Sequence, residues 1–228
     1  LKTLPQSEKQ FKGEIIWQFQ QRFSEDKLSK NYFSLNTEPQ KNLSFKIEAQ
    51  NQEDETKIKR RSLEYFIPFY KLDIILGNFQ KKFGKGVNVG NRSYLNFTST
   101  STLSSSNTFL FPLFTRYNGI FLSHTREKWQ PSVFYSENRF SHFKDQVVAG
   151  ELILEIGKFK LGPIFSLERI SDKASRYQKN CSSIYSQYKE KNFHLSGEIA
   201  FLSNDGKGGL IEVIAKQNRY SVKGIFWS

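Results

Sequence analysis

NFHLSGEIAF, at residues 192–201, alternates between apolar and polar side chains. Every second residue contributes to one apolar face, which consists of Phe193, Leu195, Gly197, Ile199 and Phe201. The positions between them carry mainly polar side chains, and Glu198 is one of these. Successive side chains of a β-strand point to opposite faces of a sheet, so a period of two residues predicts a strand with one apolar and one polar face.

The same alternation recurs along the chain, and helical periodicity is nearly absent. Comparable runs lie at residues 14–20, 43–50, 158–168 and 211–216. Turn-forming residues separate the runs at intervals of roughly 10 to 15 residues, which indicates hairpins rather than helical crossovers. We therefore predict an all-β fold, an antiparallel up-and-down meander of roughly ten to twelve strands. We expect residues 1–228 to form a single β-barrel domain or a barrel fragment, with no separate second domain.

Three polar stretches interrupt this pattern. Residues 51–61 contain a small basic cluster and are predicted to be a solvated loop. Residues 90–107 are rich in Ser, Thr and Asn and are predicted to form a long loop. Residues 169–180 are polar and basic, and we expect them to break the alternation as well.

The length and charge of the runs indicate a membrane. The runs contain about 8 to 12 residues, and a tilted strand needs about 9 to 11 residues to cross a bilayer, whereas strands of soluble sheets peak near 5 or 6. The apolar faces of the clearest strands carry no charged residue, as lipid requires, because Lys or Arg near the midplane costs about 2–4 kcal/mol. We therefore predict a transmembrane-type barrel in a bacterial outer membrane. The lipid bilayer is its expected partner, and other envelope proteins are candidate partners.

The polar faces of the strands carry charges of both signs, which a polar or water-filled lumen tolerates. The candidate lumen-facing residues are Lys46, Glu48, Glu151, Glu155, Glu198, Glu212, Lys216 and Lys223. The chain has 34 Lys plus Arg against 22 Asp plus Glu. In a conducting barrel, this excess would favour anions, by the logic of charged rings in pores.

Composition also argues against several kinds of site. Basic residues are spread along the chain instead of gathering on one face, so we expect no nucleic-acid partner. Cys181 is the single cysteine and cannot form an internal disulfide. His124, His142 and His194 lack metal-site spacing relative to it, so we expect neither metal nor cofactor.

The most distinctive run is ILGNFQ at residues 75–80 followed by FGKGVNVG at residues 83–90. A dinucleotide-binding fingerprint needs G-x-G-x-x-G between a strand and a helix. Here the third glycine comes one residue late, and no helical pattern follows. Because glycine permits unusual backbone angles and close contacts, the run predicts a bulged or tightly bent strand. Its structural glycines are Gly77, Gly84, Gly86 and Gly90.

This run resembles the G-D-(F/Y)-Q-x-x-F-G-x-G-L segment of a family of large outer-membrane β-barrels from diderm bacteria. SGEIA at residues 196–200, followed by SNDG at 203–206, resembles a second family segment, G-E-I-A-x-S-x-N-G-G. Asn78, Lys85 and Val87 stand where the family has Asp, Gln and Leu. Barrels of this family often follow competence-protein-like helix-hairpin-helix repeats. The resemblance implies a membrane barrel of poorly known function, of which these residues are a part.

Three functions are compatible with these patterns. The favoured one is an outer-membrane barrel without catalytic residues, acting as a channel, an uptake component or an envelope scaffold. The second is a membrane-embedded hydrolase, although no spacing demands a catalytic pairing, since triads are recognised by geometry. Its candidate residues are His124, His142, Ser123, Ser141 and Asp145. The third is a soluble lipocalin-like or sandwich binding domain with the apolar faces as its core, which predicts the same alternation.

Overall fold

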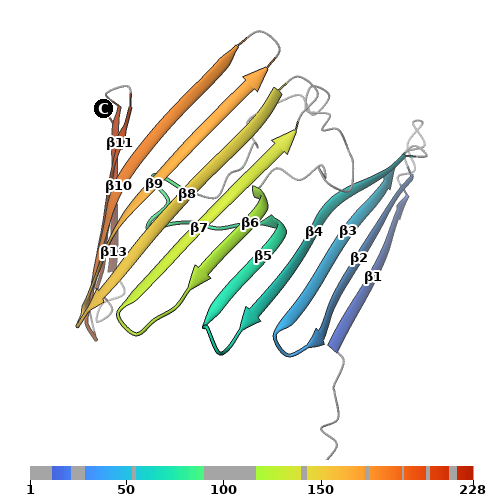
Figure 1. Ribbon diagram of the computed structural model, residues 1–228, viewed down its shortest axis with the longest axis horizontal. Coiled ribbons are helices and arrows are strands. Elements are labelled where there is room, and N and C mark those ends of the chain that lie inside the picture. Colours follow the sequence, from blue (N-terminus) through green and yellow to red (C-terminus); the bar gives the residue numbers. More distant parts are fainter. Residues whose placement is uncertain are drawn as a thin grey trace, which may run out of the picture.

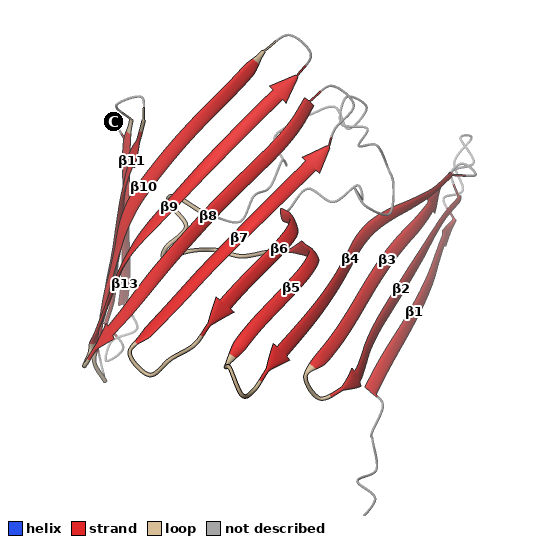
Figure 2. Ribbon diagram, in the orientation of Figure 1, coloured by secondary structure: helices blue, strands red, loops and turns tan. Residues whose placement is uncertain are grey.

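The computed structural model describes residues 12–21, 29–52, 55–89, 117–139, 143–172, 175–191, 193–203, 206–215 and 220–227. Regular structure in these ranges consists of strands (Figure 2). The strands are β1 Lys12–Gln21, β2 Ser29–Gln40, β3 Leu43–Gln52, β4 Glu55–Ile67, β5 Leu72–Phe79, β6 Tyr117–His124, β7 Trp129–Arg139, β8 Phe143–Ile156, β9 Phe159–Asp172, β10 Arg176–Lys189, β11 Phe193–Leu202, β12 Lys207–Ala215 and β13 Tyr220–Trp227. No helix formed by described residues is long and apolar enough to cross a membrane, which has no bearing on crossing by strands.

All thirteen described strands belong to one sheet, in which each strand pairs antiparallel with its neighbours in sequence. The predicted all-β, up-and-down meander is therefore confirmed, with one strand more than the predicted upper number. The sheet is strongly curved, and β1 and β13 form its two edges (Figure 1). Between these edges no pairing occurs in the described part of the chain, so the sheet is an open, curved wall.

The two ends of the sheet differ in their connections. At one end, which we name the turn end, short turns join β2 to β3, β4 to β5, β6 to β7 and β8 to β9 (Figure 1). The opposite end, the loop end, includes the long connection between β5 and β6. Lys158 and Glu190 pair between two neighbouring turns of the turn end, and this hydrogen bond lowers the pKa of the Glu190 carboxyl.

Two of the stretches predicted to interrupt the strands are themselves largely strand. Residues 57–61 lie in β4, where Lys57 pairs with Gln50 and Arg60 with Glu48. Residues 169–180 lie mostly in β9 and β10, whose ladder runs without a break up to the pair Arg176 and Ser171. The prediction of a loop was wrong for residues 55–61, whereas the break expected at residues 169–180 concerns only side-chain polarity. In both stretches, backbone pairing continues past the apolar part of a strand. The third stretch, residues 90–107, lies outside the described residues.

One face of the sheet is apolar and exposed. The register aligns one row of this face across β7 to β12, formed by Trp129, Leu154, Leu161, Ser186, Gly197 and Ile211. Neighbouring rows contribute Phe165, which is 53% exposed, and Ile184, which is 57% exposed. We name this exposed face the convex face. The opposite face of the curved sheet, which holds the buried core, is the concave face.

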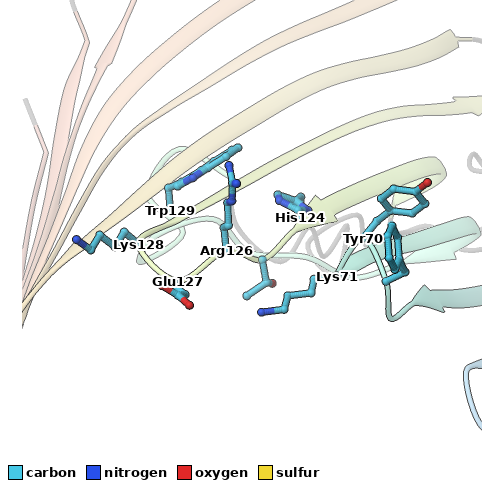
Figure 3. Close-up of a pocket in the computed structure, with 9 residues that line it drawn as sticks. Tyr70, Lys71, His124, Arg126, Glu127, Lys128 and Trp129 are labelled. Carbon is cyan, nitrogen blue, oxygen red and sulfur yellow. The ribbon is translucent and has the colours of Figure 1, made fainter.

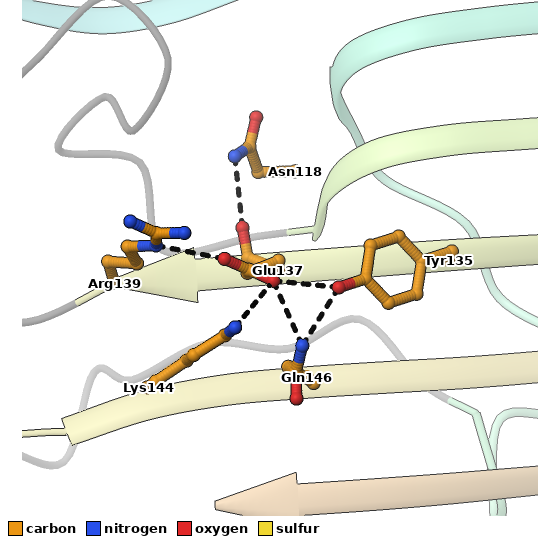
Figure 4. A network of polar contacts seen from close by, with 6 residues as sticks. All are labelled: Asn118, Tyr135, Glu137, Arg139, Lys144 and Gln146. Carbon is orange, nitrogen blue, oxygen red and sulfur yellow. Dashed lines mark hydrogen bonds and ion pairs between the residues drawn. The ribbon is translucent and has the colours of Figure 1, made fainter. Parts of the chain in front are cut away.

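Towards the loop end, the convex face ends in a polar network on β7 and β8 (Figure 4). The Glu137 carboxylate accepts a hydrogen bond from Tyr135 at 2.7 Å and pairs with Arg139 and Lys144, both at 2.9 Å. Gln146 donates to both Tyr135 and Glu137 at 2.9 Å. Apolar side chains therefore give way to charged ones beyond Tyr135.

The opposite, concave face combines an aromatic core with buried polar groups. Phe79, Tyr117, Phe121 and Phe134 pack with ring centroids 4.5 to 6.0 Å apart. Buried serines lie on the same face, for example Ser132, which pairs in register with Glu151. The concave face is thus where polar and charged groups of this fold are enclosed.

Candidate functional site

Residues 80–89 leave β5 and lie across the concave face; we name them the inner segment (Figure 1). At one side, Lys81 lies 4.4 Å from the ring centroid of Phe121 on β6. At the other, the Lys85 ammonium pairs with Glu212 on β12. The curvature of the sheet (Figure 1) thus brings β6 and β12 within reach of one short segment, whose Lys81 and Lys85 are only four residues apart.

The tip of the inner segment is a compact loop closed by its own backbone. The Phe83 N–H donates to the Val89 carbonyl at 3.0 Å, and the Gly86 N–H donates to the Phe83 carbonyl at 2.8 Å. Gly84 has φ 51° and Gly86 has φ 82°, a region that side-chain-bearing residues rarely adopt. At Gly84 and Gly86 the run therefore forms a bent loop and not the bent strand that the sequence predicts, whereas Gly77 lies within β5.

Glu198 on β11 holds this loop in place. Its carboxylate accepts backbone N–H groups of Lys85 at 2.8 Å, Val87 at 3.2 Å and Asn88 at 3.0 Å. The Ser183 hydroxyl donates to the same carboxylate at 2.7 Å. The Glu198 side chain is 1% exposed, and a buried carboxylate is tolerated only where such donors surround it. Successive N–H groups converging on one anion form a backbone nest.

Further polar contacts tie the loop to other strands. The Glu151 carboxylate on β8 accepts the Gly84 N–H at 3.3 Å. The Asn88 amide donates to the carbonyls of Ile164 at 3.3 Å and Cys181 at 3.2 Å, and accepts the Ser166 hydroxyl at 2.6 Å. Together with Glu198 and Glu212, these contacts join the loop to every strand from β8 to β12.

Apolar packing adds to this attachment. Phe83 is 1% exposed, and its ring centroid lies 5.5 Å from that of Phe134. Burial of a phenylalanine side chain stabilises by about 1.5–3 kcal/mol. The loop also fits closely against the sheet, since a Cβ at Gly84 would lie 2.7 Å from the Ile164 side chain and 2.9 Å from Glu198. A residue larger than glycine at position 84 therefore requires a shift of the loop or of the Ile164 and Glu198 side chains.

Six of the predicted lumen-facing residues share the concave face. Paired residues can be followed from strand to strand, from Lys46 on β3 through Gly77 on β5 and Val147 on β8 to Lys179 on β10. The side chains of these residues therefore lie on the same face of the sheet. By the same register, these six residues are Lys46, Glu48, Glu151, Glu155, Glu198 and Glu212. The backbone of Lys223 pairs with that of Glu212, while Lys216 and Gly90 lie outside the described residues.

The structure brings only some of these residues together. Glu151, Glu198 and Glu212 gather around the inner segment, as described above. Lys46 instead pairs with Glu48 at 2.9 Å on β3. Near the turn end, Glu155 pairs with Lys160 at 2.9 Å. Among the predicted structural glycines, Gly84 and Gly86 form the loop, and Gly77 has φ 94° within β5, where a Cβ would lie 2.4 Å from the Arg61 carbonyl oxygen.

Sequence reasoning did not identify the contact between the glycine run and Glu198. It treated the two stretches as separate features, and it did not assign a role to Asn88. One signal was available, because both stretches carry the family resemblance and conspicuous glycines accompany each. These glycines indicate that both segments are unusual, but they do not indicate that the two segments contact each other.

The described hydrolase candidates do not form a catalytic group. Ser123 and His124 are adjacent in β6, so they point to opposite faces, and the Ser123 hydroxyl lies 3.0 Å from that of Ser132. Asp145 pairs in register with Asn138 near the loop end, about 20 Å along the strands from His124 at the turn end. His142 and Ser141 lie outside the described residues.

Comparisons with known proteins give similarities at the level of solved structures. No family model and no curated protein matches this chain. A loop-deletion mutant of OmpT, an outer membrane protein of Vibrio cholerae, is 10% identical with a TM-score of 0.42, covering 88% of this chain and 87% of that chain.

Two porins are similar to the same degree. An anion-selective porin from Comamonas acidovorans is 10% identical with a TM-score of 0.43, covering 83% of this chain and 74% of its own. A triple mutant of the Rhodopseudomonas blastica porin is 11% identical with a TM-score of 0.35, covering 96% and 92%. The association with helix-hairpin-helix repeats stays a prediction.

Proposed function

We propose that this chain forms the wall of a β-barrel in a bacterial outer membrane, with its convex face towards lipid and its concave face towards an enclosed interior. The exposed apolar rows of the convex face support this proposal, because soluble monomers rarely expose apolar patches larger than a few hundred Å². A sandwich would cover such a face with a second layer. The described residues form a single sheet, and its convex face is uncovered.

The dimensions of the apolar face fit a bilayer. From Phe159 to Leu167, the convex side of β9 extends about 26 Å along the strand. For a strand tilted by about 40°, that corresponds to about 20 Å across the membrane before side-chain ends are added, close to the apolar band of about 25 Å in such barrels. Trp129 and Phe159 at the turn end and Tyr135 at the loop end flank this band as an aromatic girdle does.

We propose that this barrel is a channel or uptake component whose interior is narrowed by the inner segment. The observation that carries this proposal is the buried Glu198 carboxylate, which fixes backbone N–H groups of the segment at a set place on the concave face. A barrel that served only as a scaffold has no need for a polar attachment built to hold a loop across its interior.

The single sheet formed by all thirteen described strands also supports the proposal that this chain is one domain.

The distribution of charge changes the selectivity expected from net charge. Much of the positive excess lies at the turn end, at Lys41, Lys71, Arg126, Lys128, Lys158, Lys189 and Lys191. On β8 to β12, by contrast, acidic residues outnumber basic ones at concave register positions: Asp145, Glu151, Glu155, Glu168, Asp172, Glu198 and Glu212 against Lys160, Lys179 and Lys189. The part of the proposed pore wall formed by β8 to β12 is therefore acidic.

We expect the protein in planar bilayers to conduct with a preference for cations, in place of the anion preference that net charge suggests. The measurement is the reversal potential across a tenfold KCl gradient, with protein refolded from denaturant. A variant outside the attachment of the inner segment, Glu168→Gln on the concave side of β9, should reduce the cation preference. Absence of conductance steps, or an anion preference, would contradict the proposed channel.

A further inference from the structure

The turn end carries a pocket where basic and aromatic side chains meet. It is lined by residues of two neighbouring turns, and those that the argument uses are Tyr70, Lys71, His124, Arg126, Lys128 and Trp129 (Figure 3). The turns are fixed to each other, since the Thr125 N–H donates to the Lys71 carbonyl at 3.0 Å. The Arg126 N–H donates to the Trp129 carbonyl at 3.0 Å, which closes the second turn.

The pocket lies where the convex face ends. His124 pairs in register with Leu72, and Trp129 pairs with Leu154, so both rings belong to the convex face. Their ring centroids are 5.4 Å apart. Arg126 stands beside the Trp129 ring, with its guanidinium carbon 5.8 Å from the ring centroid (Figure 3). Apolar surface and positive charge are thus adjacent at one depth of the proposed membrane.

The aromatic side chains of the first turn are unusually exposed. Phe69 is 86% exposed and Tyr70 is 61% exposed, and their rings contact each other edge to face at 4.9 Å. Exposed aromatics beside charged residues are typical of the level where hydrocarbon meets lipid head groups. Water alone would not favour this arrangement, whereas the head-group region accommodates both the rings and the charges.

The charges of the pocket favour an anionic ligand. Lys71, Arg126 and Lys128 provide three cations against one anion, Glu127. A guanidinium matches the oxygens of a phosphate in geometry as well as in charge, and lysine ammonium groups add attraction. Towards the loop end, Leu154 and its apolar neighbours offer a surface for hydrocarbon chains. The pocket therefore combines a site for a phosphate with a site for an acyl chain.

We propose that this pocket binds the head group of an anionic phospholipid, with the phosphate at Arg126 and Lys128 and an acyl chain beside Trp129 and Leu154. This inference rests on the proposed membrane location. Outer-membrane barrels have short turns on the periplasmic side, so the lipid would belong to the periplasmic leaflet. It would anchor the two turns that join β4 to β5 and β6 to β7.

The test compares lipid binding by the delipidated full-length protein in detergent, with stabilisation against thermal unfolding as the readout. Phosphatidylglycerol is titrated against phosphatidylcholine of equal chain length, and inorganic phosphate is a third titrant. We expect phosphatidylglycerol to bind about tenfold more tightly than phosphatidylcholine, and the double variant Arg126→Gln, Lys128→Gln to lose this preference. Lys71→Gln, a single exposed change, should lose part of it.

The matched control is Lys189→Gln with Lys191→Gln, which removes two charges of the turn end outside the pocket. An equal loss in this control would overturn the proposal, because it would indicate diffuse attraction to a basic rim. Equal binding of both lipids, or stabilisation by inorganic phosphate as strong as by phosphatidylglycerol, would overturn it too. Protein that stays monomeric and folded without detergent would instead overturn the proposed membrane location, so the two failures are distinguishable.

Discussion

Replacing Glu198 by alanine should detach the inner segment from the concave face and enlarge the conducting path. The change removes one buried carboxylate and leaves backbone N–H groups of Lys85, Val87 and Asn88 without their acceptor. Leaving a buried donor unsatisfied costs about 1–3 kcal/mol. A total loss of about 3 kcal/mol shifts the equilibrium between attached and detached segment by more than about a hundredfold.

The measurement is single-channel conductance, accompanied by protease digestion of the segment in folded protein. We expect Glu198→Ala to show larger conductance steps and faster cleavage between residues 80 and 89 than the unchanged protein. The control is Glu155→Ala, which removes an exposed carboxylate of the same face that pairs with Lys160 near the turn end. That variant should keep the conductance and the protection of the unchanged protein.

Gly84→Ala tests the same attachment from the side of the loop. It introduces a Cβ 2.7 Å from the end of the Ile164 side chain and 2.9 Å from the Glu198 carboxylate, at a residue with φ 51°. The loop or these two side chains must shift, and we expect the shift to weaken the attachment. Gly224→Ala is the matched control, because a Cβ at Gly224 meets nothing within 4 Å. If Glu198→Ala and Gly84→Ala both show the same conductance as the unchanged protein, the result would contradict the proposal that the inner segment narrows the pore.

Ile184→Arg should strongly reduce folding into lipid vesicles. Ile184 is 57% exposed on the convex side of β10, and it pairs in register with Pro163 and Ile199 near the middle of the apolar band. An arginine facing lipid at the midplane costs about 2–4 kcal/mol. The measurement is the free energy of unfolding in vesicles by denaturant titration, with the folded fraction read from heat-dependent gel mobility.

Asn180→Arg is the control for depth, since it places the same side chain on the same strand and face. Asn180 pairs in register with Leu167 at the loop-end boundary of the apolar band. There the expected cost falls to about 0–1 kcal/mol. Equal effects of the two changes, or no effect of Ile184→Arg, would indicate that water rather than lipid covers the convex face.

The sequence predicted the features of this fold that have a local cause. Alternation at residues 193–201 follows from the two faces of β11, and the absence of charge on the apolar side of each run is what the proposed contact of the convex face with lipid requires. The polar ends of β4, β9 and β10 were missed. Their strand conformation depends on pairing with distant residues, and local composition does not reveal that pairing.

The candidate site depends on contacts across even longer separations. Glu198 was predicted to face the interior, but its partners lie 110 to 113 residues earlier in the chain. Their meeting depends on the curvature of the whole sheet and on the loop closed by Phe83 and Val89. Neither has a periodic signature, so the glycine run could be recognised as bent without its place in the fold being known.

Nitroxide labels on β9 provide the most direct test of which face meets lipid. In a Cys181→Ser background, single cysteines replace Leu161 and Phe165 on the convex face and Lys160 and Glu168 on the concave face. For protein folded in vesicles, we predict strong relaxation by oxygen at the first pair and by a water-soluble nickel chelate at the second. The reverse pattern, or labels on Leu161 and Phe165 that neither reagent reaches, would contradict a convex face exposed to lipid.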